Sequence, residues 1–343
     1  MLGEYSPGVQ GEIGLNKTYT RALALVLMVL ASMVPATFAT QNATPAATPL
    51  ASPVAGPGLP AAVDWLVSQQ QDDGSWLGMT GAPDAGTTVD AIIALAAARE
   101  AGLDVDAPID SALSWLDSGE VAASYAETGT GQAAKLLLAL VAAGADEVEI
   151  GGVDPLSLLD AGFDAETGLY GSGLYDHAYV LMALSAVDAE IPAKSIEFAG
   201  TVQAANGGFA WDGSTDETMV DSNTTSMVLQ ALVAAGEATD NPVVAGAAGY
   251  LRTTVTDQGA AYSVGGEADA NSTALVAQAL LAIGEDVTHL TTALNTFQNA
   301  SGAYHWMHSD VADNAFSTIQ VIPAAAGVSL PVIPGMMHMD KAA

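Results

Sequence analysis

A repeated apolar segment constrains the fold of this 343-residue chain more than any other feature. An Ala-Leu pair inside an apolar run recurs at intervals of 45, 44, 48 and 48 residues, and a Val-Ile pair follows 42 residues later. The pairs begin at Ala94, Ala139, Ala183, Ala231, Ala279 and Val321. Self-similarity with a period of roughly 20 to 50 residues is typical of repeat architectures. The sequence therefore predicts six copies of one structural unit.

Each unit has the pattern of a helical hairpin. The repeated runs, such as 133–143 and 273–283, are apolar on nearly every face, which is typical of helices buried on most sides. In three units the run is followed by a glycine that can end a helix in the left-handed conformation, namely Gly144, Gly236 and Gly284. Between the runs lie amphipathic segments, and five of the six begin at a proline, which suits a first helical turn. These prolines are Pro60, Pro108, Pro155, Pro192 and Pro242.

A single hairpin of this kind cannot bury its apolar face, so the units must stack on one another. Six units can close into a ring in which apolar inner helices touch each other and amphipathic outer helices cover them. Strand-like alternation is absent over any useful length. We predict an all-α fold in which six helix-hairpin repeats over residues 61–330 close into an α/α toroid, or α6-α6 barrel. A linear solenoid is the alternative.

A Gln-x3-Gly-x-aromatic pattern marks the turn from outer to inner helix in three units. Its members are Gln70, Gly74 and Trp76, then Gln203, Gly207 and Phe209, then Gln298, Gly302 and Tyr304. We expect the amide to donate to carbonyls at the end of the outer helix and to accept from the start of a neighbouring helix. The glycine would allow the reversal, and the aromatic ring would cover the amide. The other units keep fragments: Leu116 and Tyr125, Gly168 and Tyr170, and Leu251, Gly259 and Tyr262.

These structural staples resemble the Gln-Trp repeats of the terpenoid cyclase and protein prenyltransferase superfamily, over residues 61–330. The same toroid is shared by the helical domain of cobalamin carriers and by the thioester domain of complement-like proteins. The resemblance implies the fold more firmly than the function, because one fold hosts unrelated activities.

The residues that those activities need are largely missing. The Asp-x-Asp-Asp acid motif of squalene-type cyclases has its nearest match at 104–107, which lacks the final acid. The chain has no cysteine for a prenyltransferase zinc site or a complement thioester. Cobalamin carriers hold their ligand against a second, β-rich domain that this sequence does not show. We predict no catalytic residue, no metal site and no cofactor, with a weak metal alternative at His305, His308 and Asp310.

The N-terminal region has the pattern of an export signal. Lys17 and Arg21 precede the apolar run 22–34, and small residues continue to residue 39, so 1–39 is predicted to be a signal peptide. A retained membrane anchor is the alternative. Residues 40–60, rich in Ala, Thr and Pro, are predicted to be a disordered linker, and 331–343 a flexible tail. We expect a secreted or cell-surface protein with no membrane span after cleavage.

The charge restricts the partners. The chain has 39 acidic and 7 basic residues and a net charge of −32. A field of that sign repels nucleic acid, phosphorylated metabolites and anionic lipid. We expect a small neutral or cationic ligand, or a protein partner.

Polar side chains gather where the inner helices begin, and their residue types suit a polar ligand or cation. The predicted ligand-binding residues are Asp176, His177, Asp221, Asn223, Asp269 and Asn271. Helix capping is the alternative for the acids and amides, and a satisfied helix-end role for the histidine. Three functions stay open: a non-catalytic binding or scaffold module, a cyclase-type enzyme with Asp176 or Asp221 as an atypical acid, and a cobalamin-carrier-like domain.

Overall fold

The computed structural model describes residues 58–145 and 147–335, all within the unit that begins at Pro53. The predicted signal peptide, all but the last three residues of the predicted linker, and the end of the tail lie outside the described residues.

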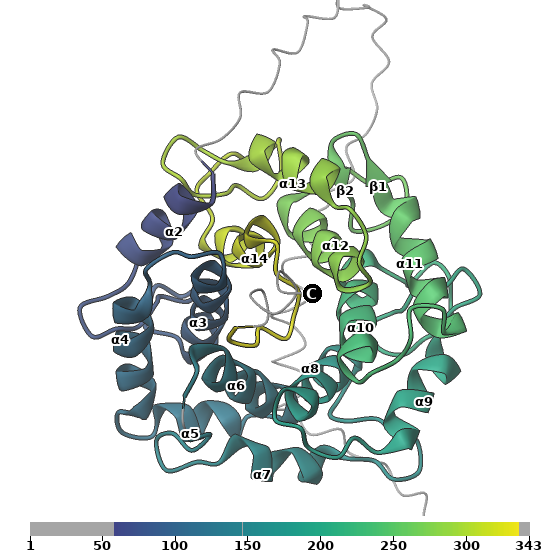
Figure 1. The fold of residues 1–343 in the computed structure, drawn as a ribbon, viewed down its shortest axis with the longest axis horizontal. Helices are drawn as coiled ribbons and strands as arrows, with labels where there is room; N and C mark the ends of the chain where they lie inside the picture. The colour runs from purple at the N-terminus through teal and green to yellow at the C-terminus, as the bar shows by residue number, and fades with distance from the viewer. Residues whose placement is uncertain (1–57, 146, 336–343) are drawn as a thin grey trace, which may run out of the picture. The chain divides into compact units, whose positions relative to one another are not determined.

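Six inner helices form a closed ring (Figure 1). Each contacts the next along the chain, and the last contacts the first. They are α3 (Ala85–Glu100), α6 (Thr130–Ala143), α8 (Leu174–Ala186), α10 (Ser222–Ala234), α12 (Ala270–Ala282) and α14 (Ala315–Ala326). Because α14 packs against α3, the ring is closed and the linear solenoid does not apply.

A second set of helices covers the ring from outside (Figure 1). They are α2 (Leu59–Ser68), α4 (Asp106–Asp117), α5 (Val121–Ala126), α7 (Pro155–Leu159) with the 3-10 turn η1 (Asp160–Gly162), α9 (Ala193–Val202), α11 (Pro242–Thr254), and α13 (Thr288–Leu294) with η2 (Asn295–Phe297). In the fifth unit, β1 (Val255–Thr256) pairs antiparallel with β2 (Gly259–Ala260), with Val255 opposite Ala260. The predicted all-α toroid of helical hairpins is confirmed.

The inner helices are buried on nearly all sides, as their composition predicts. In α3, every residue from Ala91 to Ala98 is at most 8% exposed. Burial of apolar surface stabilises the fold by about 25 cal/mol per Å². The predicted helix stops are also confirmed, because Gly144, Gly236 and Gly284 have φ angles of 77°, 90° and 81° at or just after the ends of α6, α10 and α12.

The three staples tie successive outer helices together. The glutamine Nε2 donates to the staple glycine carbonyl and to a carbonyl at the start of the next outer helix. For Gln203 these acceptors are Gly207, at 2.9 Å, and Val243 of α11, at 2.8 Å. The expectation that the amide serves the end of its own helix is therefore wrong, because the staple turn packs on the following outer helix. The equivalent bonds, all 2.9 Å, join Gln70 to Gly74 and Pro108, and Gln298 to Gly302 and Gly58.

The packed chain continues beyond α14. The main-chain N–H of Leu330 donates to Gln230 Oε1 of α10 at 2.9 Å, and that of Gly335 donates to Glu100 Oε2 of α3 at 3.0 Å. Val332 between them is 2% exposed. The first five residues of the segment predicted to be a flexible tail thus contact the ring, because Val332 is buried and the Gly335 amide is hydrogen-bonded. Within 58–335, no helix is long and apolar enough to cross a membrane.

Candidate functional site

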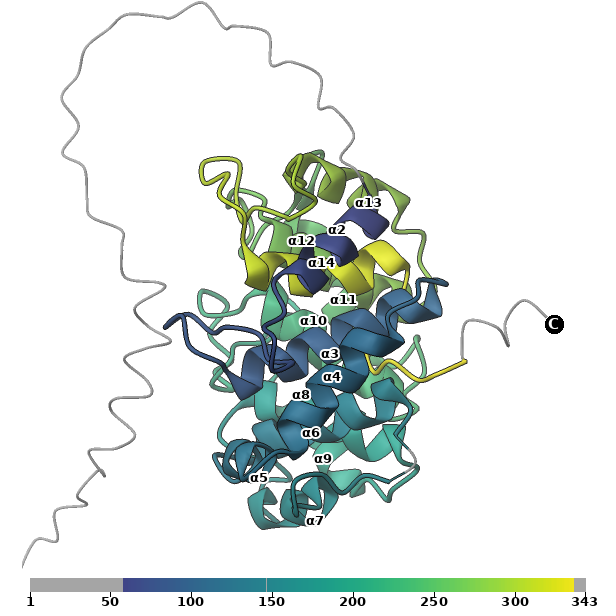
Figure 2. The same ribbon diagram turned by 90° about the vertical axis from the view of Figure 1, so that its left-hand side faces the viewer.

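All inner helices begin on one face, because every unit runs from an outer to an inner helix. The loops that precede α3 and α14 project from this face, and the chain after α14 leaves on the opposite side (Figure 2). We call the residues of these loops, of the equivalent loops before α10 and α12, and the first two residues of α14 the rim. The rim comprises residues 77–84, 211–221, 261–269 and 305–316.

Two of the predicted acids cap inner helices. Asp221 accepts from the Thr224 N–H at 2.7 Å, and Asp269 accepts from the Ser272 N–H at 2.8 Å. Asp84 caps α3 in the same way. These contacts match the capping alternative and satisfy otherwise unpaired amides at the helix starts.

Both capping acids are also covered by an aromatic residue of the next unit. Burial raises the pKa of the Asp221 carboxyl to about 6, although hydrogen bonds from Thr224 and Tyr262 oppose the shift. Burial likewise raises the pKa of Asp269, against hydrogen bonds that include one from Trp306. The two carboxyl groups are therefore buried and hydrogen-bonded, and they offer little surface to a ligand.

The two predicted asparagines occupy the first turns of α10 and α12. Asn271 is 5% exposed and reaches α14, where its Nδ2 donates to Gln320 Oε1 at 2.7 Å and its Oδ1 accepts from Ser317 Oγ at 2.8 Å. Asn223 holds the same helical position in α10 and is half-buried. Asn271 thus joins two inner helices.

Asp176 is held by the loop that precedes its own helix. Its Oδ2 accepts from the N–H and the hydroxyl of Ser172, at 2.9 and 2.8 Å. A Cβ atom at Gly131 of α6 would lie only 2.1 Å from Asp176 Oδ1. The carboxylate therefore lies in close contact with the neighbouring inner helix.

His177 is a buried structural residue, 1% exposed. Its Nδ1 accepts from the Tyr170 N–H at 3.1 Å, and its Nε2 lies 3.0 Å from the Ser195 carbonyl. Because a carbonyl only accepts, Nε2 carries the proton and the ring is neutral. Burial lowers the pKa of His177 to about 4. Neither ring nitrogen is left for a ligand.

His177 takes the place of a threonine found in other units. In four units, the first-turn threonine hydroxyl accepts the N–H of the residue at the staple aromatic position, at 2.9 or 3.0 Å. The pairs are Thr88 with Trp76, Thr225 with Phe209, Thr273 with Ala260, and Thr318 with Tyr304. In the fifth unit Ala260 therefore occupies the aromatic position, so the assignment of Tyr262 to it was wrong by two residues.

The rim aromatics were not identified from the sequence. Trp211, Tyr262 and Trp306 are 44%, 41% and 39% exposed, and each follows the staple aromatic position by two residues. The main-chain carbonyl of each accepts the first N–H of the preceding inner helix, from Leu174, Ser222 and Ala270, at 2.9 to 3.0 Å. The Phe-x-Trp and Tyr-x-Trp spacings of the fourth and sixth units were the available signal.

Side chains from all six inner helices occupy one level of the ring below the rim. Six residues after the helix cap, the inner helices carry Asp90, Lys135, Tyr179, Met227, Leu275 and Gln320. Lys135 Nζ lies 2.7 Å from Asp90 Oδ1 and 5.5 Å from the centre of the Tyr179 ring. Met227 and Leu275 are 1% and 6% exposed. The other four residues, Asp90, Lys135, Tyr179 and Gln320, are partly buried.

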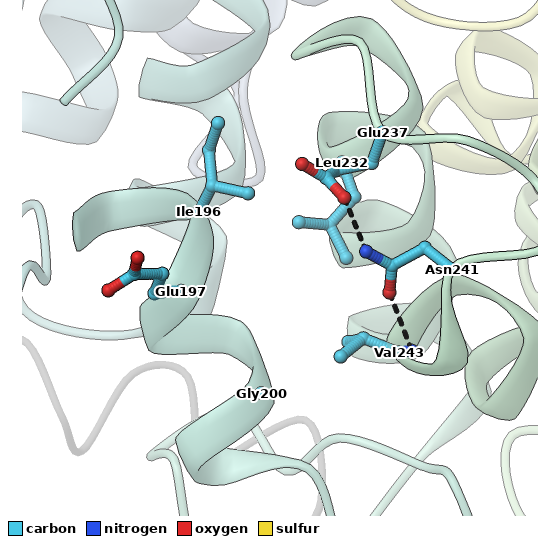
Figure 3. A pocket seen from close by; sticks show the side chains of 7 residues that line it. All are labelled: Ile196, Glu197, Gly200, Leu232, Glu237, Asn241 and Val243. Carbon is cyan, nitrogen blue, oxygen red and sulfur yellow. Dashed lines mark hydrogen bonds between the residues drawn. The ribbon is translucent and has the colours of Figure 1, made fainter. Parts of the chain in front are cut away.

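The hollow shown in Figure 3 is one of two in the outer wall and lies between α9, α10 and α11. Its volume is about 240 Å³, and Ile196 and Glu197 of α9 face Glu237 and Asn241 across it. Asn241 is occupied by its neighbours, because it donates to Glu237 and accepts from the Val243 N–H at 2.8 Å. This volume is below the range of about 300 to 1,000 Å³ usual for ligand pockets.

The other predicted alternatives lie away from the ring centre. Asp106 begins the outer helix α4 with its side chain 69% exposed, so the partial cyclase motif is at the surface. His305 is buried, and its Nδ1 lies 3.1 Å from Asn299 Oδ1. Among the residues described, no group of three or more His, Asp or Glu side chains is arranged to hold a metal ion.

Solved structures with this fold serve different functions. The type II terpene cyclase MstE from Scytonema is 16% identical, with a TM-score of 0.56 over 78% of this chain and 96% of that one. Haptocorrin in complex with Cbi is 14% identical, with a TM-score of 0.52 over 80% and 67%. A D-mannose isomerase is 12% identical, with a TM-score of 0.54 over 78% and 96%. No protein-family model matches the sequence, and the search of curated proteins finds no match.

The chain therefore has an all-α toroid fold like that of terpene cyclases and of a cobalamin carrier. At these identities the likeness concerns the fold alone, and the function must be argued from the site.

Proposed function

We propose that this protein is a secreted or cell-surface binding module without catalytic activity, and that it binds through the rim. The observation that carries the proposal is the contrast between the two levels of the ring. At one level Met227 and Leu275 are buried and Asp90 pairs with Lys135, whereas the level above exposes Trp211, Tyr262 and Trp306. Exposed aromatic residues on a rigid scaffold are typical of recognition surfaces.

The charge of the rim supports a neutral or cationic ligand. The rim contains no lysine or arginine, and it carries acids in each of its four loops. Such a surface disfavours anions and attracts cations. Haptocorrin, solved in complex with Cbi, shares the fold and supports a binding role for a toroid of this kind.

An enzyme of the cyclase type is the second candidate, and Asp221 favours it. Its carboxyl is 1% exposed with a pKa raised by burial to about 6, as a proton donor would need. Proton-initiated cyclisation also needs an apolar cavity beside the acid, whereas hydrogen bonds from Thr224 and Tyr262 surround this one. The module is therefore the better supported of the two.

Native mass spectrometry of the protein secreted by its own host would test the proposal. We expect the wild type to retain a ligand that the double variant Trp211→Ala, Trp306→Ala loses. The variant Glu120→Ala on the outer wall, where Glu120 is exposed, is the matched control and should retain the ligand. If the Trp211→Ala, Trp306→Ala variant retained the ligand, the binding site would lie outside the rim.

A parallel assay addresses the enzyme candidate. Purified protein would be incubated with squalene and with geranylgeranyl diphosphate, each with magnesium, and the organic extract analysed. We expect no product. A cyclised product that Asp221→Asn abolishes would establish catalysis and contradict the module.

A further inference from the structure

We propose that the rim binds a cationic polypeptide segment that carries aromatic or aliphatic side chains. This inference rests on the proposed function and names the class of partner. It follows from where the exposed apolar residues lie, how they are arranged around the ring, and which charges surround them.

Every strongly exposed large apolar residue of the described chain belongs to the rim. Met79 is 91% exposed, Val311 62% and Phe316 59%. The full set is Leu77, Met79, Trp211, Met219, Tyr262, Val264, Trp306, Val311 and Phe316. Scattered surface apolar residues need no explanation, but concentration on one face marks an interaction site.

The apolar residues follow an arc around the ring. They come from the loops of the fourth, fifth, sixth and first units, which are consecutive because α14 packs against α3. The Ser222 N–H donates to the Tyr262 carbonyl, and the Ala270 N–H donates to the Trp306 carbonyl. Each bond joins the start of one inner helix to the rim loop of the next unit. A surface that spans four units suits an extended polypeptide better than a small molecule. Tryptophan, tyrosine, phenylalanine and methionine, which dominate this arc, are enriched at protein interfaces.

The charges around the arc are all acidic. The exposed acids of the rim are Asp84, Asp212, Asp216, Glu217, Glu267, Asp310 and Asp313. A partner with positive charge would be attracted, whereas a second copy of this −32 chain, nucleic acid or an anionic membrane would be repelled.

The lysines and arginines of the described residues are engaged elsewhere. Arg99 donates to the carbonyls of Ala142 and Ala143 at the end of α6. Lys135 pairs with Asp90 inside the ring. On the outer wall, Lys194 donates to the Ala165 carbonyl and Arg252 pairs with Glu285. None of these contacts involves an acid of the rim.

Binding of defined peptides tests the inference. Isothermal titration would compare a short synthetic peptide of alternating lysine and leucine with a glutamate-leucine peptide and a lysine-serine peptide. We expect the lysine-leucine peptide to bind, the lysine-serine peptide to bind at least about tenfold more weakly, and the glutamate-leucine peptide not to bind. Loss of one or two central aromatic anchors commonly weakens an interface by about tenfold or more.

Variants locate the binding. Trp211→Ala with Trp306→Ala, and separately Glu217→Gln with Glu267→Gln, should each weaken the lysine-leucine peptide by about tenfold or more in total. Asp64→Asn with Glu120→Gln removes the same charge from exposed positions of the outer wall and should leave affinity unchanged. Circular dichroism would confirm that every variant is folded.

The outcomes separate this inference from the proposed function. Equal weakening by the rim and outer-wall charge variants would show that net charge alone attracts the peptide, and would overturn the inference. The inference would also be overturned if the lysine-leucine peptide did not bind, or if the glutamate-leucine peptide bound equally well. If the host-derived ligand is nevertheless lost in the Trp211→Ala, Trp306→Ala variant, the rim is the binding face and only the partner class is wrong.

Discussion

Gln298 and Gly58 lie 240 positions apart in the sequence and share two hydrogen bonds. The Gly58 N–H donates to Gln298 Oε1 at 2.7 Å, and Gln298 Nε2 donates to the Gly58 carbonyl at 2.9 Å. This staple joins the last unit to the start of the first outer helix. It therefore closes the outer layer, as the contact between α14 and α3 closes the inner one.

Removing this staple should destabilise the ring. Gln298→Ala leaves partly buried main-chain groups without partners, which costs on the order of 1–3 kcal/mol of unfolding free energy. Gln203→Ala, which removes an internal staple, should cost a similar amount. Gln258→Ala, at an exposed hairpin position, is the control. Chemical denaturation would measure all three, and a Gln298→Ala protein as stable as the control would contradict the structural role of the staple.

The staple glycines are required by close packing as well as by their backbone angle. Gly207 and Gly236 have φ angles of 88° and 90°, so alanine strains both positions alike, by about 1 kcal/mol. A Cβ at Gly207 would also lie 2.2 Å from the Gly246 carbonyl oxygen, whereas one at Gly236 would meet nothing within 4 Å. Gly207→Ala should therefore lower the melting temperature clearly more than Gly236→Ala. An equal decrease in melting temperature for the two variants would refute the packing argument.

His177 should make stability fall in acid. Burial lowers its pKa from 6.5 to about 4 in the folded protein. Above pH 6.5 both states are neutral, but as pH falls from 6.5 to 4 the unfolded chain binds a proton that the folded chain does not. Stability is lost over that window, on the order of 1–3 kcal/mol. His177→Thr, which installs the residue used in four other units, should flatten this part of the pH profile. An unchanged profile would mean that His177 has the same pKa in the folded and unfolded states.

Asp221, unlike His177, should make stability fall as the pH rises. Burial raises its pKa from 3.8 to about 6, so the stability it contributes is present below pH 3.8 and is lost as pH rises through 6. Asp221→Asn keeps a good capping residue and removes the buried charge. We expect the variant to be more stable than wild type at pH 7, on the order of 1 kcal/mol, and to gain little at pH 4. Asp84→Asn, at an exposed cap, is the control, and a loss of stability at pH 7 in Asp221→Asn alone would contradict the burial argument.

The fold could be predicted because its causes are local and repeated. The alanine-rich runs, the glycine stops and the prolines at outer-helix starts recur with one period, and each acts within a few residues. The partner of a staple glutamine could not be predicted, because Val243 lies 40 positions from Gln203 and its approach depends on how units stack.

The candidate site was harder to predict than the fold. A first-turn histidine has the same sequence signature whether it binds a ligand or, like His177, replaces a hydrogen-bonding threonine. The fifth unit was misaligned with the others, because an alanine occupies its staple aromatic position and Tyr262 lies two residues further on. Trp211 and Trp306 could have been found from the sequence, because each follows a staple aromatic, Phe209 or Tyr304, by two residues.

Thiol accessibility tests most directly whether this protein binds on its rim and not inside its ring. The chain has no cysteine, so a single introduced thiol reports one position. In folded protein, Ser263→Cys on the rim should react with a maleimide as rapidly as an exposed peptide thiol. Leu275→Cys in the ring centre should be strongly protected and should react only after denaturation. Rapid reaction of Leu275→Cys in the folded protein would reveal an open central cavity, and would contradict the binding module in favour of a cyclase-like enzyme.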